Sequence, residues 1–169
     1  TSVGDFPIEA VKIMARIIER TEEVALDQIP PLKHEPSTKG GAITKAATEV
    51  GSTVGAKFLV AFTQSGDSAR RMSRLRSPIP MLALTPEIGT YNRLALSWGV
   101  ESMLTAVVNH TDEMVMQVDT LLIESKRVNI GDLVLIVAGS PPGIPGSINA
   151  MRVHKIGDAV GGVAPAYRK

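Results

Sequence analysis

The chain of 169 residues contains no cysteine, which excludes disulfide bonds, thiol nucleophiles and thiolate metal sites. It also has no apolar run close to the ~20 residues that a membrane-spanning helix needs. Its first residues lack the basic, apolar and small-residue order of a secretory signal. From these absences we expect a soluble cytoplasmic domain that does not bind a membrane.

An excess of charge of one sign is missing as well. Lysine and arginine total 18 against 17 acidic residues, so the net charge of +1 gives no electrostatic footprint for nucleic acid. The histidines His34, His110 and His154 do not have metal-ligand spacing, and we interpret each as a surface or capping residue. No Ser–His–Asp set, paired carboxylates or P-loop with its lysine stands out. We therefore expect no catalytic constellation and no metal site in this chain.

Aromatic residues make up only 4% of the chain, so small and branched aliphatic residues must fill the core. Short, continuously apolar runs alternate with segments of helical periodicity, which predicts a parallel sheet covered on both faces. A further segment, 151–156, alternates apolar and polar residues. Only a loop joins it to the preceding run, whereas a parallel pair needs about a dozen connecting residues, so we predict an antiparallel edge strand. The apolar runs are residues 58–62, 81–84, 102–108 and 133–137.

The predicted helices have recognisable starts. Asp5 is predicted to cap the first helix, and the second is expected to begin near Ser37 or Thr38. Thr85 is the expected cap of the helix that follows the second apolar run. Thr111 is the expected cap of the helix that precedes the fourth run.

The segment after the first apolar run, which we name the hydroxyl loop, is the first candidate site. In an open α/β sheet, ligands bind beyond the carboxyl ends of the strands, where the winding direction reverses. Three hydroxyls, a glycine and free N–H groups at a helix start suit a phosphate. The same residues also suit an ordinary capped β-to-α turn. The hydroxyl loop consists of Thr63, Gln64, Ser65, Gly66, Asp67 and Ser68.

The segment after the fourth apolar run, residues 138–147, is the second candidate, and we name it the proline loop. Three glycines and three prolines in ten residues give it a defined shape. It could fold over a ligand, or simply join two antiparallel strands. Its candidate effector-loop residues are Gly139, Ser140, Pro141, Pro142, Gly143, Gly146 and Ser147.

Several segments together resemble one family, pyruvate kinase. Residues 1–11 resemble its stretch G-E-T-A-x-G-x-[YF]-P-x-E-A-V, which enters the last barrel helix. Residues 63–69 resemble its effector-phosphate loop T-x-S-G-x-[ST]-A, and residues 147–154 its closing strand G-x-T-N-x-x-x-V-H. These matches occur in the same order as in the family and extend along nearly the whole chain. The sequence of the proline loop is similar to that of actinobacterial members. The chain thus resembles the C-terminal, allosteric domain of pyruvate kinase.

This resemblance implies a three-layer α/β/α fold with a five-stranded mixed sheet in the order 3-2-1-4-5, strand 5 being antiparallel. Residues 1–28 would be the terminal helix segment of the preceding barrel domain, and 29–169 the C-terminal regulatory domain. The stretch that carries Pro30, Pro31 and Pro36 is the expected linker. Because the match begins inside a family motif, we expect a fragment of a larger enzyme.

The resemblance also implies a role. Pyruvate kinase, an enzyme of glycolysis, transfers a phosphoryl group from phosphoenolpyruvate to ADP, with Mg²⁺ and K⁺ held in its barrel. The chain is therefore expected to be inactive alone, to need no cofactor itself, to contact that barrel and to belong to a tetramer. The family uses the closing strand at a tetramer contact, so we expect self-association through residues 150–156. A free-standing small-molecule-binding module and a purely structural tetramerisation unit remain alternatives.

The family's effector suggests the ligand. Members regulated by fructose 1,6-bisphosphate commonly carry Arg or Lys where this chain has Asp67, which can turn toward Arg70 or Arg71. We therefore expect a monophosphate, such as a hexose monophosphate or AMP, in place of the bisphosphate.

Overall fold

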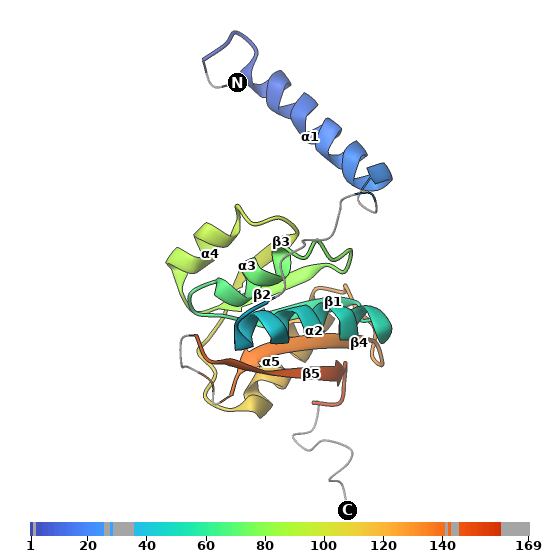
Figure 1. The fold of residues 1–169 in the computed structure, drawn as a ribbon, viewed down its shortest axis with the longest axis vertical. Coiled ribbons are helices and arrows are strands. Elements are labelled where there is room, and N and C mark those ends of the chain that lie inside the picture. Colours follow the sequence, from blue (N-terminus) through green and yellow to red (C-terminus); the bar gives the residue numbers. More distant parts are fainter. Residues whose placement is uncertain (2, 26–27, 29–35, 141, 143–145, 160–169) are drawn as a thin grey trace, which may run out of the picture. The chain divides into compact units, whose positions relative to one another are not determined.

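The computed structural model describes residues 1, 3–25, 28, 36–140, 142 and 146–159 (Figure 1). The chain divides into two compact units, Thr1–Lys33 and His34–Lys169. The assignment of residues 1–28 and 29–169 to two domains of a parent enzyme stays a prediction.

The smaller unit contains a single helix, α1 (Pro7–Ala25). The carbonyl of Phe6 accepts the hydrogen bond from the Ala10 amide at 3.0 Å, so Phe6 holds the N-cap position that the sequence assigned to Asp5. None of the residues of α1 is buried, although apolar residues recur at helical spacing, among them Val11 and Ile18. The apolar face of α1 is thus not buried within the smaller unit.

A five-stranded mixed sheet forms the centre of the larger unit (Figure 1). Its order is β3-β2-β1-β4-β5, and β5 alone runs antiparallel, against β4, which confirms the predicted order and direction. The strands are β1 (Phe58–Phe62), β2 (Met81–Thr85), β3 (Val100–Leu104), β4 (Leu133–Gly139) and β5 (Ile148–Lys155).

Helices cover both faces of this sheet, as predicted for a three-layer fold. Successive residues of β1 point to opposite faces. Leu59 and Ala61 join the core cluster that contains residues of α2, α3 and α4, whereas Phe58 and Val60 join the cluster that contains residues of α5. The helices are α2 (Lys39–Thr53), α3 (Asp67–Ser73), α4 (Ile88–Leu94) and α5 (Thr111–Glu124).

The helix starts agree only in part with the sequence-based expectations. Thr38 is the N-cap of α2, and its hydroxyl accepts the Gly41 amide at 3.1 Å, as predicted. Thr85 ends β2 instead of capping α4. Glu87 holds the N-cap position of α4, and its amide donates to Thr85 Oγ1 at 3.2 Å. His110 holds the N-cap position of α5, which the sequence assigned to Thr111.

The third strand differs most from its prediction. It was expected over residues 102–108 and instead spans Val100–Leu104 at the sheet edge. Because β3 is an edge strand, it can carry the exposed charged residue Glu101. The Glu101 carboxylate accepts a hydrogen bond from Arg127 Nη1 at 2.6 Å. Residues 105–108 therefore lie beyond the strand. Across the described part of the chain, no helix is long and apolar enough to cross a membrane.

Candidate functional site

The two predicted loops meet in one pocket at the carboxyl ends of β1 and β4. These strands are parallel neighbours, so the segments that follow them emerge at the same sheet edge. From the hydroxyl loop, the lining includes Thr63, Gln64, Ser65, Asp67 and Ser68; from the proline loop, Gly139, Pro142, Gly146 and Ser147. Of the other predicted site residues, Gly66 and Ser140 lie outside the lining, and Pro141 and Gly143 lie outside the described residues.

The remaining walls come mainly from the ends of β2 and β3 and from α5, and they are mostly apolar. They include Leu84, Met114 and the four residues 105–108. Sequence reasoning missed this wall because it assigned residues 105–108 to a strand. The cavity volume is about 70 Å³, room for roughly five water molecules at the ~15 Å³ that each needs. A single phosphate group is of this size, and the rest of a sugar phosphate would extend toward the opening.

The hydroxyl loop is a tight turn held by its own side chains. Gly66 has φ of +82°, a conformation that favours glycine, and its amide donates to Thr63 Oγ1 at 2.9 Å. The Asp67 amide donates to Ser65 Oγ at 3.4 Å. Both hydroxyl oxygens act as acceptors here, so each hydroxyl proton remains available to an anionic ligand. Capped turn and anion site are therefore compatible roles for the same residues.

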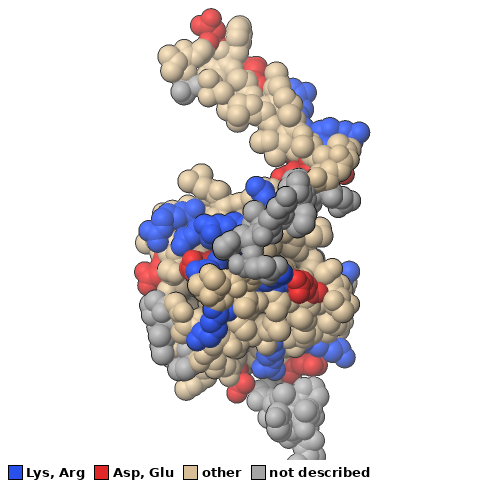
Figure 2. All heavy atoms as spheres, in the orientation of Figure 1, with Lys and Arg blue, Asp and Glu red and all other residues tan. Residues whose placement is uncertain are grey.

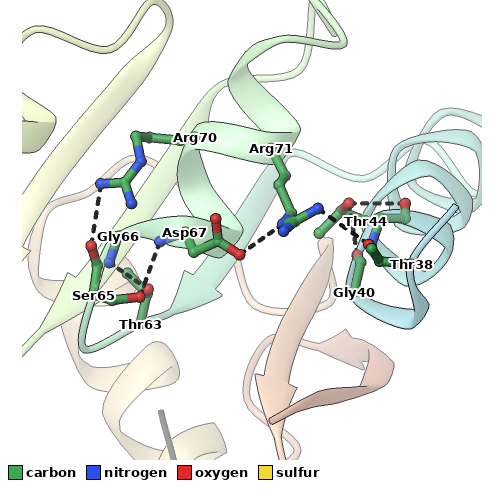
Figure 3. A network of polar contacts seen from close by, with 10 residues as sticks. Thr38, Gly40, Thr44, Thr63, Ser65, Gly66, Asp67, Arg70 and Arg71 are labelled. Atoms are coloured by element: carbon green, nitrogen blue, oxygen red, sulfur yellow. Dashed lines mark hydrogen bonds and ion pairs between the residues drawn. The ribbon is translucent and has the colours of Figure 1, made fainter. Parts of the chain in front are cut away.

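The acidic side chain of this loop is turned toward an arginine. Arg71 Nε lies 2.6 Å from Asp67 Oδ2, and in Figure 3 the Asp67 carboxylate points toward Arg71 and away from Thr63 and Ser65. This confirms the orientation expected from the sequence, with Arg71 as the partner. Arg70 Nη1 instead donates to the Ser65 carbonyl at 3.1 Å.

Positive charge gathers beside this turn. Figure 2 shows Lys and Arg side chains clustered over α3 and α4, helices that carry Arg70, Arg71 and Arg93. Arg93 Nη2 donates to Thr90 Oγ1 at 3.0 Å, and the Thr90 hydroxyl donates to the Gln64 carbonyl at 2.6 Å. The surroundings of the hydroxyl loop are thus more basic than the net charge of the chain suggests.

One buried polar pair was missed by sequence reasoning. His154, expected at the surface, is 2% exposed, and its Nε2 lies 2.7 Å from Asp119 Oδ1. Asp119 Oδ2 accepts the amides of Gly157 and Ala159, both at 3.1 Å. The available signal was the position of Asp119 on the apolar face of α5, next to Val118. Neither member of the pair lines the pocket, so we assign it a structural role.

The other histidines add no ligand set. His110 is exposed and makes no side-chain capping bond to α5, and His34 lies outside the described residues. Within the described ranges, no three His, Asp or Glu side chains are placed to hold a metal ion.

Comparison with protein families identifies the fold. The family described as "Pyruvate kinase, alpha/beta domain" matches residues 41–154, which include the hydroxyl loop and all five strands up to His154. The chain belongs to this family. The resemblance predicted from the sequence is therefore confirmed.

Individual pyruvate kinases resemble this alpha/beta domain along most of its length. Pyruvate kinase from Mycobacterium tuberculosis H37Rv is 49% identical over 158 residues, which are 94% of this chain and 33% of that protein. Pyruvate kinase from Corynebacterium glutamicum is 42% identical with the same coverage. The chain thus spans about a third of the length of these actinobacterial relatives.

Solved structures share the fold. The crystal structure of a pyruvate kinase from Cryptosporidium parvum has a TM-score of 0.73 at 23% identity, covering 90% of this chain and 31% of that one. A structure of the Cryptosporidium parvum enzyme in complex with ADP has a TM-score of 0.71 at 26% identity. The sheet and its covering helices are therefore those of the C-terminal part of known pyruvate kinases.

Proposed function

We propose that this chain is the regulatory and assembly domain of a cytoplasmic pyruvate kinase. The parent enzyme would transfer a phosphoryl group from phosphoenolpyruvate to ADP in glycolysis, with Mg²⁺ and K⁺ bound in its barrel. The family membership and the one-third coverage of the relatives support this assignment. Residues 1–28 would complete the barrel, and residues 29–169 would form the regulatory domain of a tetramer.

The regulatory part of the proposal is the binding of a phosphorylated effector in the pocket. The observation that carries it is the convergence of the hydroxyl loop and the proline loop on one cavity. Thr63, Ser65, Ser68 and Ser147 bring hydroxyl groups to its lining. Hydroxyl donors bind phosphate oxygens through charge-assisted hydrogen bonds, which are stronger than neutral ones. A phosphate is the ligand that this set of donors fits best.

A monophosphate fits this pocket better than a bisphosphate. Asp67 lines the pocket, and two unit charges of the same sign repel by about 4 kcal/mol at ~4 Å and an effective dielectric constant near 20. The ion pair with Arg71 lowers this cost for one phosphate, and a loop that carries Asp67 in place of a basic residue should hold one phosphate better than two. A hexose monophosphate or AMP is therefore favoured over fructose 1,6-bisphosphate.

Calorimetry with glucose 6-phosphate, AMP and fructose 1,6-bisphosphate tests the proposal. The monophosphates should bind more tightly, and Ser65→Ala should weaken them about tenfold or more, the usual effect of losing a hydrogen bond to a charged group. Ser68→Asp should weaken them further, and Asp67→Lys should shift the preference toward the bisphosphate. Ser125→Ala, in a hydroxyl outside the pocket lining, is the control. Sub-micromolar bisphosphate binding to the unmodified chain would refute the monophosphate assignment.

A further inference from the structure

The Arg71 side chain connects two parts of the larger unit that are distant in sequence. Its Nε lies 2.6 Å from Asp67 Oδ2, and its Nη1 donates to Thr38 Oγ1 at 3.2 Å, across 33 residues of chain (Figure 3). A guanidinium is a rigid planar fork, so holding one of its nitrogens restricts where the other can lie. The position of Asp67 is thereby linked to that of Thr38.

The Thr38 end of this link is tightly packed. Thr38 is the N-cap of α2 and accepts the Gly41 amide at 3.1 Å. A Cβ atom on Gly41 would lie 2.8 Å from Pro36 Cβ, 3.1 Å from Thr38 Oγ1 and 3.6 Å from Arg71 Nη1. Pro36 is also the first described residue of the larger unit, and Thr38 is the third. Arg71 therefore contacts the chain at the point where it enters α2.

The Asp67 end of the link belongs to the pocket. Asp67 is the acidic residue among the described lining residues, whereas Arg71 is outside that lining. Side-chain exposures of 34% for Arg71 and 41% for Asp67 leave both groups able to respond to a charge nearby. The ion pair holds the carboxylate away from the hydroxyl groups of Thr63 and Ser65 (Figure 3).

We propose that Arg71 is a positioning residue that couples anion binding in the pocket to the N-terminus of α2. The coupling to an anion rests on the proposed function. An anion in the pocket repels the Asp67 carboxylate and favours its outward position against Arg71, which in turn favours the contact of Arg71 with Thr38. Because coupling between two sites is reciprocal, loosening the contact at Thr38 weakens anion binding by the same factor.

The first arm of the test needs no ligand. NMR measures the solvent exchange rate of the Gly41 amide in the 169-residue chain. Arg71→Gln should raise this rate by up to about fivefold, the size of an N-cap contribution. Asp67→Asn should raise it in the same direction through Arg71. Arg74→Gln removes the same charge from an exposed residue at the end of α3 and should leave the rate unchanged. If the exchange rate of the Gly41 amide is unchanged in Arg71→Gln, the proposal is overturned, whether or not an anion binds in the pocket.

The second arm titrates inorganic phosphate into the same variants. Arg71→Gln should weaken binding by up to about tenfold, because the unpaired Asp67 carboxylate can turn toward the pocket. Adding Asp67→Asn to Arg71→Gln should restore the original affinity, a rescue that a merely structural arginine would not show. Arg71→Lys keeps a cation beside Asp67 but lacks the planar fork. The affinity for phosphate should therefore persist, while phosphate should no longer slow the solvent exchange of the Gly41 amide as it does in the unmodified chain.

The two arms separate the possible failures. If the unmodified chain does not bind phosphate, the proposed effector function fails, and the exchange rates of Asp67→Asn and Arg71→Gln still decide the link to Thr38. If phosphate binds equally well to the unmodified chain and to Arg71→Gln, the positioning role of Arg71 is refuted and the effector function stands.

Discussion

At the scale of single residues, two adjacent glycines at the start of α2 have different surroundings. A Cβ atom on Gly40 would meet Ile148 Cδ1 at 3.5 Å, an ordinary van der Waals contact. The same atom on Gly41 would lie 2.8 Å from Pro36 Cβ and 3.1 Å from Thr38 Oγ1. Alanine is favoured over glycine within helices by up to ~1 kcal/mol, so only crowding separates the two positions.

We expect opposite effects from the two alanine substitutions. Gly40→Ala should raise the free energy of unfolding by about 0.5–1 kcal/mol, because it gains helix propensity without a clash. Gly41→Ala should lower it by about 1–3 kcal/mol, the usual cost of overpacking. Urea unfolding of both variants measures the difference. Equal stabilisation by both would mean that the packing of Pro36 and Thr38 around Gly41 is loose, which would also weaken the case for the Arg71 link.

The residues of the pocket could be predicted from the sequence where they lie close together along the chain. The hydroxyl loop was found because hydroxyls, a glycine and a strand end lie within six consecutive residues. The pair of His154 and Asp119 was not found, because its members are 35 residues apart and meet only when β5 packs near α5. The same holds for Arg71 and Thr38. Contacts between distant segments need the tertiary fold.

At the scale of elements, β5 is an edge strand with exposed apolar side chains. Its pairing with β4 leaves its other edge open within the described part of the chain. Met151 is 40% exposed and Val153 is 43% exposed, with Arg152 between them. An exposed edge of this kind tends to pair with another chain, and charge is what usually prevents it.

We therefore expect the chain to self-associate weakly through residues 150–156. Val153→Lys should shift the equilibrium toward monomer by about tenfold or more, because it places a charge where association would bury an apolar side chain. Leu96→Lys, at a position that is 94% exposed and outside β5, should leave the equilibrium unchanged. Sedimentation velocity measures both. A purely monomeric unmodified chain at high concentration would contradict this assembly role.

The order and direction of the strands were predictable, whereas some of their bounds were not. Apolar runs separated by helical segments predict a parallel sheet, and the short connection before β5 predicts its reversal. β3 was placed too late because residues 103–108 form one apolar stretch. The first part of that stretch pairs with β2, and the last part lines the pocket. Hydrophobicity alone does not distinguish a sheet residue from a pocket wall.

At the scale of the whole molecule, two features support the proposal that the chain is part of a larger enzyme. The chain spans about a third of its pyruvate kinase relatives. In α1, none of the residues is buried, and Val11, Ile17 and Ile18 are each more than half exposed. An amphipathic helix is stabilised mainly by packing of its apolar face, so α1 would gain stability from a further protein surface.

The residues of the pocket predict that the chain does not transfer phosphoryl groups on its own. Phosphoryl transfer depends on metal-held carboxylates and on cations positioned around the phosphate. The pocket instead offers hydroxyl groups and one carboxylate, which is already paired with Arg71. With phosphoenolpyruvate, ADP, Mg²⁺ and K⁺, a coupled assay should record only background from the purified chain, while full-length pyruvate kinase from Mycobacterium tuberculosis serves as the positive control. Turnover within tenfold of the ~1–100 s⁻¹ of ordinary kinases would show that the chemistry resides in this domain and would refute the regulatory assignment.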